Sequence, residues 1–167
     1  MTHLFEIRSL RVEDWAAVQQ IYAEGISTGN ATLETRAPSW EDWDLAHAPV
    51  PRLVAVAGSE VLGWAALAPV SRRPVYRGVA EVSVYVAVSA QRRGVGRGLL
   101  GELVAAAERA GYWTLQASVL SENAASVALH QQAGFRLVGT RERIGQRDGV
   151  WRDTLLLERR SRIIGVD

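Results

Sequence analysis

Apolar and polar residues alternate in the middle of the chain. Valine occupies every second position from Val82 to Val88, while Glu81, Ser83 and Tyr85 hold the positions beside and between the first valines. Successive side chains of a strand point to opposite faces, so this pattern predicts a strand with one valine face and one polar face. A helix is predicted next by apolar residues four positions apart, at Val95, Leu99, Leu103 and Ala107. A polar row is unusual on a strand that should be central, so this stretch is a candidate site.

Glycines, prolines and polar loops divide the rest of the chain into further short elements. Strands are predicted at residues 4–10, 52–57, 61–67, 113–120, 135–144 and 150–158. Helices are predicted to begin near residues 12, 39 and 123. Ser39 and Asn123 are residue types that cap the start of a helix. We expect one domain over residues 1–160 and a loose C-terminal tail over residues 161–167.

A turn rich in glycine and arginine joins the alternating strand to its helix, with the sequence Gln91-Arg92-Arg93-Gly94-Val95-Gly96. The first turn of a helix has unpaired N–H groups and the positive end of the helix dipole, so it attracts anions. Glycine lets a phosphate approach the backbone closely, and arginine adds positive charge. The residues themselves therefore predict a pyrophosphate cradle beside a strand that carries a carboxylate.

Composition excludes several classes of protein. The 167 residues include no cysteine, which excludes disulfides and cysteine metal sites. His3, His47 and His130 are scattered without metal-ligand spacing, and a formal net charge of +1 argues against a dedicated nucleic-acid surface. No apolar run is long enough to span a bilayer, and no basic-then-apolar leader begins the chain. We expect a cytoplasmic protein with no metal, nucleic-acid or membrane partner.

The glycine-rich turn is similar to the acyl-CoA pyrophosphate loop of the GNAT superfamily of N-acetyltransferases. The preceding Ser83-Val84-Tyr85-Val86 resembles the branch that contains phosphinothricin and methionine sulfoximine or sulfone acetyltransferases. That branch also carries patterns like Asn123-Ala124-Ala125-Ser126, Leu129-His130 and Gly134-Phe135, then Gly139, Gly145, Trp151 and Asp153. The resemblance covers residues 4–158. It implies the GNAT fold, an α/β (α+β) architecture with a twisted, mixed, mostly antiparallel sheet of about seven strands and about four flanking helices.

The resemblance implies direct transfer of the acetyl group of acetyl-CoA to the amine of a small amino-acid-like acceptor, in a homodimer. Glu81 is predicted to be the general base, because this branch carries a glutamate before the same phrase. Its alternative is a structural ion pair with an arginine, for which the candidates are Arg72, Arg73 and Arg77. His130 is predicted to protonate the departing thiolate, at a position where many family members have tyrosine. Its alternative is a satisfied structural histidine.

The residues expected to bind acetyl-CoA are also implied by the resemblance. Backbone amides of Val84, Tyr85 and Val86 would hold the acetyl and pantetheine groups at a splay or bulge in the strand. The pyrophosphate would lie against Arg92, Arg93, Gly94, Val95, Gly96 and Arg97. Asn123 and Ser126 would contact the pantetheine chain, although Asn123 is equally suited to capping its own helix.

Two loops are candidates for binding the acceptor. The loop over residues 69–78 offers arginines that can pair with a carboxylate or phosphinate, and we select Arg73, Val75 and Tyr76. The resemblance implies that the loop over residues 25–36 covers the acceptor, which makes Thr32 and Glu34 candidates. A solvated loop face is the alternative for both.

Other functions are weaker matches to the same residues. Gly96-Arg97-Gly98-Leu99-Leu100-Gly101 fits the Gly-x-Gly-x-x-Gly pattern of dinucleotide-binding folds, but three residues separate the turn's first glycine from Ala90 and the earlier strands pair as hairpins. A nucleoside triphosphatase loop lacks its Gly-Lys-Ser/Thr signature. The nearer rivals are an acetyltransferase for a polyamine or a protein N-terminus, and a non-catalytic acyl-CoA-binding module.

Overall fold

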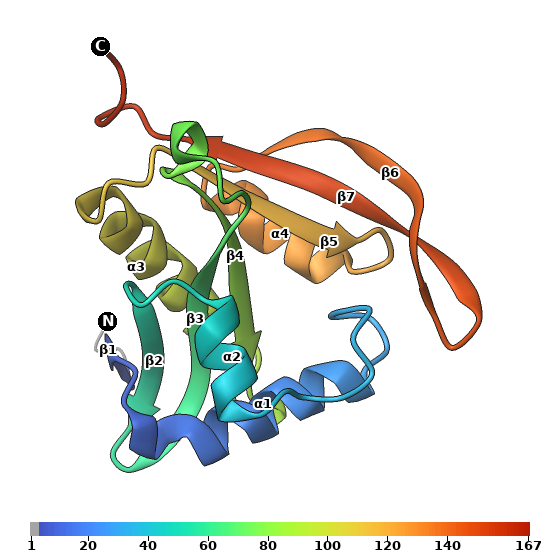
Figure 1. Ribbon diagram of the computed structural model, residues 1–167. Coiled ribbons are helices and arrows are strands. Elements are labelled where there is room, and N and C mark those ends of the chain that lie inside the picture. Colours follow the sequence, from blue (N-terminus) through green and yellow to red (C-terminus); the bar gives the residue numbers. More distant parts are fainter. Residues whose placement is uncertain (1–3) are drawn as a thin grey trace.

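One twisted seven-stranded sheet forms the centre of the molecule, in the strand order β1-β2-β3-β4-β5-β7-β6 (Figure 1). The computed structural model describes residues 4–167; His3 therefore lies outside the described residues. The strands are β1 (Glu6–Ser9), β2 (Arg52–Ala57), β3 (Glu60–Pro69), β4 (Val79–Val86), β5 (Thr114–Leu120), β6 (Arg136–Arg147) and β7 (Val150–Arg160). Neighbouring strands are antiparallel except β4 and β5, which are parallel. The mixed, mostly antiparallel sheet predicted from the sequence is confirmed.

Four α-helices, counted over the described residues 4–167, cover the two faces of the sheet. They are α1 (Trp15–Ser27), α2 (Trp40–Ala46), α3 (Val95–Arg109) and α4 (Ala124–Gln132). Short 3₁₀ helices are η1 (Val12–Asp14), η2 (Pro74–Tyr76) and η3 (Val88–Ala90). Helices α1 and α2 lie on one face, where Tyr22 and Trp43 contact Trp64 of β3. Helices α3 and α4 lie on the opposite face (Figure 1). No helix among the described residues is long and apolar enough to cross a membrane.

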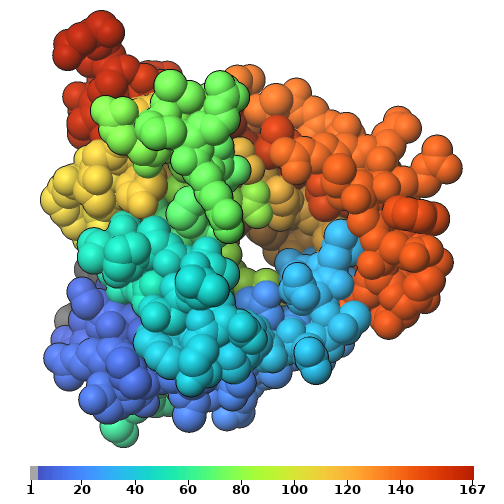
Figure 2. Space-filling view, in the orientation of Figure 1, coloured from blue at the N-terminus to red at the C-terminus, as the bar shows by residue number. Residues whose placement is uncertain are grey.

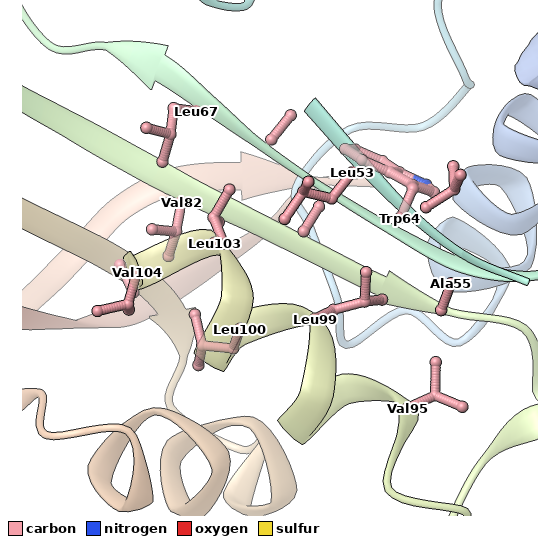
Figure 3. Packing of buried hydrophobic residues seen from close by; sticks show 14 of the residues in the cluster. Leu53, Ala55, Trp64, Leu67, Val82, Val95, Leu99, Leu100, Leu103 and Val104 are labelled. Carbon is pink, nitrogen blue, oxygen red and sulfur yellow. The ribbon is translucent and has the colours of Figure 1, made fainter. Parts of the chain in front are cut away.

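The apolar core fills the space between the sheet and α3. Leu99 and Leu103 of α3 are fully buried, as the spacing of four predicted, and Leu100 is fully buried beside them. All three pack against the valine face of β4 (Figure 3). Gly63 of β3 allows this contact, because a Cβ there would lie 2.9 Å from Leu99 Cδ1 and 2.7 Å from the Tyr85 carbonyl oxygen. The valine face of β4 therefore belongs to the core, and its polar face is left for the side of α1.

The C-terminal tail, residues 161–167, forms hydrogen bonds with Arg160 and within itself. Arg160 donates hydrogen bonds to the carbonyl oxygens of Trp113, Ser161, Ile164 and Gly165. The Ser161 hydroxyl accepts hydrogen bonds from the N–H groups of Ile163 and Ile164. One arginine thus satisfies three carbonyls of the tail and also the Trp113 carbonyl, 47 positions away, a contact that loop-like composition does not reveal.

Candidate active site

The parallel strands β4 and β5 pair over only three residues and then separate. Their pairing runs from Val79 with Thr114 to Glu81 with Gln116. Beyond that point β4 stays paired with β3, and β5 stays paired with β7. Two central strands are therefore left with backbone groups that face a gap instead of each other. The splay expected in this strand is present, and the pairing of β4 with β3 shows no register shift.

Hydrogen bonds at both ends of β4 identify which residues face this gap. The Ala87 N–H donates to the Leu62 carbonyl on the β3 side, while the Gly78 carbonyl accepts from the Thr114 N–H on the β5 side. Because backbone groups alternate along a strand, the even-numbered positions of β4 face β5 and the odd-numbered ones face β3. The N–H groups that face the gap are those of Val82, Val84 and Val86. The Tyr85 N–H faces β3 instead.

Glu81 lies where the two strands separate. Its Oε2 accepts hydrogen bonds from Gln116 Nε2 at 2.9 Å and from Ser118 Oγ at 3.1 Å. Glu81 is half-buried, and none of the ion pairs found among residues 4–167 involves it. The carboxylate is thus oriented by two neutral donors of β5, which leave its charge uncompensated. Sequence reasoning missed both donors, although polar residues at every second position of β5 were a signal.

Aromatic side chains line the same face of β4 as Glu81. The Tyr85 ring stacks on Trp64 at 4.9 Å between ring centroids and on Tyr22 of α1 at 4.8 Å. The hydroxyl groups of Tyr22 and Tyr85 lie near each other and near Thr32. Burial is the main cause that raises the pKa of both phenols, and the nearby Glu34 carboxylate adds to the shift. Both hydroxyls therefore stay protonated at neutral pH and serve as hydrogen-bonding groups.

The turn before α3 has the features of an anion site. Arg92 and Gly94 both adopt left-handed backbone conformations, with φ of 60° and 80°. Gly94 is the N-cap residue of α3 and supplies no side-chain cap, so the first N–H groups of the helix are free. Arg92, Arg93 and Arg97 are exposed and form no ion pair with other described residues. These groups fit a pyrophosphate, which needs N–H donors and positive charge.

Asn123 has two structural tasks at the start of α4. Its Oδ1 accepts a hydrogen bond from the Ser126 N–H at 3.1 Å, which caps the helix. Its Nδ2 donates to the Asn30 carbonyl at 3.1 Å, across the gap from α4. Capping, one of the two roles expected for this residue, is present. The contacts of Asn123 and Ser126 with pantetheine stay predictions.

His130 is buried in α4, with 6% of its surface exposed. Its Nδ1 lies 2.7 Å from the Ser126 carbonyl oxygen, so Nδ1 carries the proton and Nε2 is the unprotonated nitrogen. Its ring meets Phe135 edge to face at 5.3 Å. Burial lowers the pKa of His130, and the Ser126 carbonyl partly opposes that shift. A neutral ring with this tautomer has no Nε2 proton to donate, so these contacts favour a structural role.

The His130→Gln variant should therefore lose stability while keeping kcat near that of the wild type. The unfolded imidazole, with a pKa of about 6.5, takes up a proton before the folded one does. Stability present above pH 6.5 is thus lost as the pH falls through that range, by at most about 1.4 kcal/mol per pH unit. Thermal unfolding should therefore show that lowering the pH from 7.5 to 5.5 destabilises the variant less than it destabilises the wild type. A folded variant with strongly reduced kcat would instead support proton donation by His130.

The arginine-rich loop before β4 is exposed on the Glu81 end of the strand. Arg73 lies over the Tyr76 ring, with its guanidinium carbon 5.2 Å from the ring centroid. Arg77 lies over Trp113 in the same way, at 5.4 Å. Val75 and Tyr76 belong to η2 and are exposed. Tyr76 thus helps to orient the Arg73 guanidinium, whose charge stays free for an anionic group.

The space-filling view shows a central opening in the molecule (Figure 2). Its border is formed by the loop after α1, by α2, by the arginine-rich loop and by the β6–β7 hairpin. The α1 side of the sheet carries Glu81, Tyr85 and the loop that contains Glu34. The other side carries the anion site, at the start of α3, and His130, in α4. The gap between β4 and β5 connects the two faces. No three histidine, cysteine, aspartate or glutamate side chains of residues 4–167 come together as a metal site.

Comparison with known proteins agrees with this geometry. The model of the acetyltransferase (GNAT) family matches residues 11–135. Phosphinothricin N-acetyltransferase of Alcaligenes faecalis is 36% identical over 159 residues, which are 92% of this chain and 81% of that protein. L-methionine sulfoximine/L-methionine sulfone acetyltransferase of Pseudomonas aeruginosa is 34% identical over 161 residues, which are 91% of this chain and 92% of that protein. The crystal structure of a GNAT superfamily phosphinothricin acetyltransferase from Sinorhizobium meliloti, in complex with AcCoA, has a TM-score of 0.85 and 29% identity, covering 94% of this chain and 88% of that one.

Proposed function

This chain belongs to the acetyltransferase (GNAT) family, and from that premise we propose that it transfers the acetyl group of acetyl-CoA to the amine of a small amino-acid-like acceptor. The observation that carries this proposal is the position of Glu81. Its carboxylate lies where β4 and β5 separate, next to strand N–H groups that face the gap and without a cationic partner among the described residues. A base and hydrogen-bond donors for a carbonyl oxygen are the two things that aminolysis of a thioester needs.

Each part of the site has one task in this proposal. Acetyl-CoA supplies an activated acetyl thioester. Glu81 accepts the proton of the attacking amine, directly or through a water molecule, while Gln116 and Ser118 hold its carboxylate in place. The N–H groups of Val84 and Val86 donate hydrogen bonds to the acetyl and pantetheine groups and stabilise the developing oxyanion. The carbon–sulfur bond then breaks and CoA leaves as its thiolate. Protonation of that thiolate by His130 stays a prediction, and the contacts of the His130 ring favour the structural alternative.

The start of α3 would hold the pyrophosphate of acetyl-CoA. Free N–H groups after Gly94 meet the phosphate oxygens, and the exposed side chains of Arg92, Arg93 and Arg97 add charge. A side chain at Gly96 would reach 3.4 Å from Val86 Cγ2 and 3.5 Å from Leu129 Cδ2, within the space between β4 and α4. Gly96 therefore leaves room for the cofactor chain to pass from the pyrophosphate site to the gap.

The acceptor would approach Glu81 from the face of α1. Arg73 is available to bind its carboxylate or phosphinate, and the loop after α1, which carries Glu34, lies on the opposite border of the opening. The relatives named for phosphinothricin and for methionine sulfoximine or sulfone support an acceptor of this chemical class. A polyamine or a protein N-terminus is the second candidate, and it differs in lacking an anionic group beside the reactive amine.

Thiol release from acetyl-CoA, measured across a panel of amines, tests the proposal. The panel holds phosphinothricin, methionine sulfoximine, methionine sulfone, ordinary amino acids, spermidine and a short peptide. We expect release with the amino-acid analogues and none with spermidine or the peptide. Release only with spermidine or the peptide would overturn the acceptor class. Tight binding of acetyl-CoA without release by any amine would indicate a non-catalytic acyl-CoA-binding module.

The proposal also includes a homodimer in the cytoplasm, and both stay predictions. The resemblance implies the dimer, and the β6–β7 hairpin offers a surface for it. Exposed apolar side chains on these strands include Leu137, Val138, Ile144, Val150 and Trp151. Apolar groups gathered on one hairpin are typical of an interface with another protein.

A further inference from the structure

The loop after α1 is tied to the far side of the opening. We call residues 28–36 the acceptor loop and the β6–β7 hairpin the arm. Arg147 of the arm donates from Nη1 to the Thr32 carbonyl at 3.0 Å and from Nη2 to the Ile26 carbonyl at 2.8 Å. Only 13% of its side chain is exposed. One buried guanidinium therefore joins the arm both to the acceptor loop and to the end of α1.

A second arginine of the arm makes a similar connection. Arg152 donates from Nη1 to the Gly29 carbonyl at 3.1 Å, and from Nη2 to Asn30 Oδ1 at 3.2 Å. Its Nη2 also pairs with the Glu122 carboxylate at 3.0 Å, and 18% of its side chain is exposed. The bond from Asn123 to the Asn30 carbonyl lies beside these contacts. The acceptor loop is thus held at several of its backbone carbonyls.

Packing supports the same connection. A Cβ at Gly145 of the arm would lie 2.4 Å from Leu33 Cδ1, so the absence of a side chain there lets the loop approach closely. Figure 2 shows the result, because the loop after α1 meets the hairpin and completes the border of the central opening. Without these contacts the loop would have few partners of its own, since its remaining hydrogen bonds are short-range ones at Thr28 and Thr32.

We propose that Arg147 and Arg152 are positioning residues that fix the acceptor loop as one wall of the acceptor site, and that they thereby set the affinity for the acceptor and its size limit. This inference rests on the proposed function. Neither arginine contacts Glu81 or the anion site. Their action passes through Thr32, whose side chain lies near the hydroxyl groups of Tyr22 and Tyr85 on the Glu81 face.

The position of the contacts predicts which kinetic constant changes. The acceptor loop lies on the α1 side, whereas the start of α3 lies on the other face of the sheet, so a released loop should leave acetyl-CoA binding intact. A displacement of about 1 Å in a positioning group costs up to about 100-fold in rate. A variant whose acceptor loop is released should also accept longer amines, which the closed border of the central opening excludes in the wild type.

The test compares Arg147→Ala, Arg152→Ala and Arg147→Lys with the wild type. Arg136→Ala is the matched control, because Arg136 lies on the same strand as Arg147 but forms an exposed ion pair with Glu158. We expect KM for the amine that the wild type acetylates to rise at least about tenfold in both alanine variants, with KM for acetyl-CoA within about twofold of the wild type. Arg147→Lys should recover part of the effect, since an ammonium group can reach one of the two carbonyls.

Amide hydrogen exchange over residues 29–35 provides a readout that needs no acceptor. Exchange should become faster in the alanine variants and stay unchanged in Arg136→Ala. Unchanged exchange, or an equal rise in both KM values, would overturn the inference. If the wild type acetylates no amine, the proposed function fails and the positioning role fails with it, whereas hydrogen exchange alone still decides whether the loop is tied to the arm. Loss of folding in Arg147→Ala leaves Arg152→Ala and Arg147→Lys to decide the outcome.

Discussion

Replacing Glu81 by glutamine is expected to lower kcat by about 100- to 10,000-fold at neutral pH, the usual contribution of a general base. The amide oxygen of glutamine can still accept the hydrogen bonds that Gln116 and Ser118 now donate to Oε2. The shape of the site is therefore retained and only the ability to accept a proton is lost. KM for acetyl-CoA should change little, because the cofactor is held by strand N–H groups and by the start of α3. Steady-state kinetics with varied acetyl-CoA and acceptor measure both constants.

The dependence of kcat on pH distinguishes a base from a carboxylate that only orients the acceptor. The wild type should lose activity at acidic pH, and this fall in kcat should be absent from the residual activity of Glu81→Gln. Glu60→Gln is the control, since Glu60 is exposed at the start of β3 and should leave both kinetic constants unchanged. A Glu81→Gln enzyme with the turnover of the wild type would remove Glu81 from the role of general base.

Local sequence pattern was enough to locate two parts of the candidate site, the polar face of β4 and the turn before α3, because each is formed by one short stretch of the chain. Alternation of valine with polar residues predicted β4 and its polar face, because side chains of a strand change face at every residue. The glycine-rich turn predicted the features that suit an anion, since the left-handed Gly94 and the free N–H groups of α3 are consequences of nearby residues. These two features also carried the resemblance to the family, and with it the topology of the sheet.

Contacts between distant segments could not be predicted in the same way. The partners of Glu81 lie on β5, 35 and 37 positions further along the chain, and their identity depends on the register of the parallel pair β4 and β5. Arg147 and Arg152 are more than 100 positions from the acceptor loop that they hold. In sequence they are ordinary hairpin charges. A guanidinium that binds backbone carbonyls leaves no pattern at its target, because every residue has a carbonyl.

Trp64→Ala is expected to lower the free energy of unfolding by about 3–5 kcal/mol, the range for removing a large aromatic side chain from a core. The Trp64 ring is fully buried and contacts Tyr22, Trp43 and Tyr85. It is the side chain through which β3 contacts both α1 and α2, so its loss leaves a cavity between the sheet and two helices. Denaturant unfolding followed by circular dichroism measures the change. Leu45→Ala, at a largely exposed position of α2, should stay within about 0.5 kcal/mol of the wild type.

Trp64→Phe separates packing from hydrogen bonding at the same position. The Trp64 Nε1 is buried without an acceptor among the described residues, and an unpaired buried donor costs about 1–3 kcal/mol. Phenylalanine removes that donor while its ring still stacks on Tyr85. The smaller ring lowers the stability, whereas removal of the unpaired donor raises it, so the two effects oppose each other. The variant should therefore be destabilised by far less than Trp64→Ala. An equal loss in both variants would mean that the indole nitrogen is satisfied in solution and that the stability depends on the full width of the ring. Because Tyr85 stacks on Trp64 and its hydroxyl lies near Thr32 of the acceptor loop, a folded Trp64→Ala enzyme should also bind the acceptor more weakly.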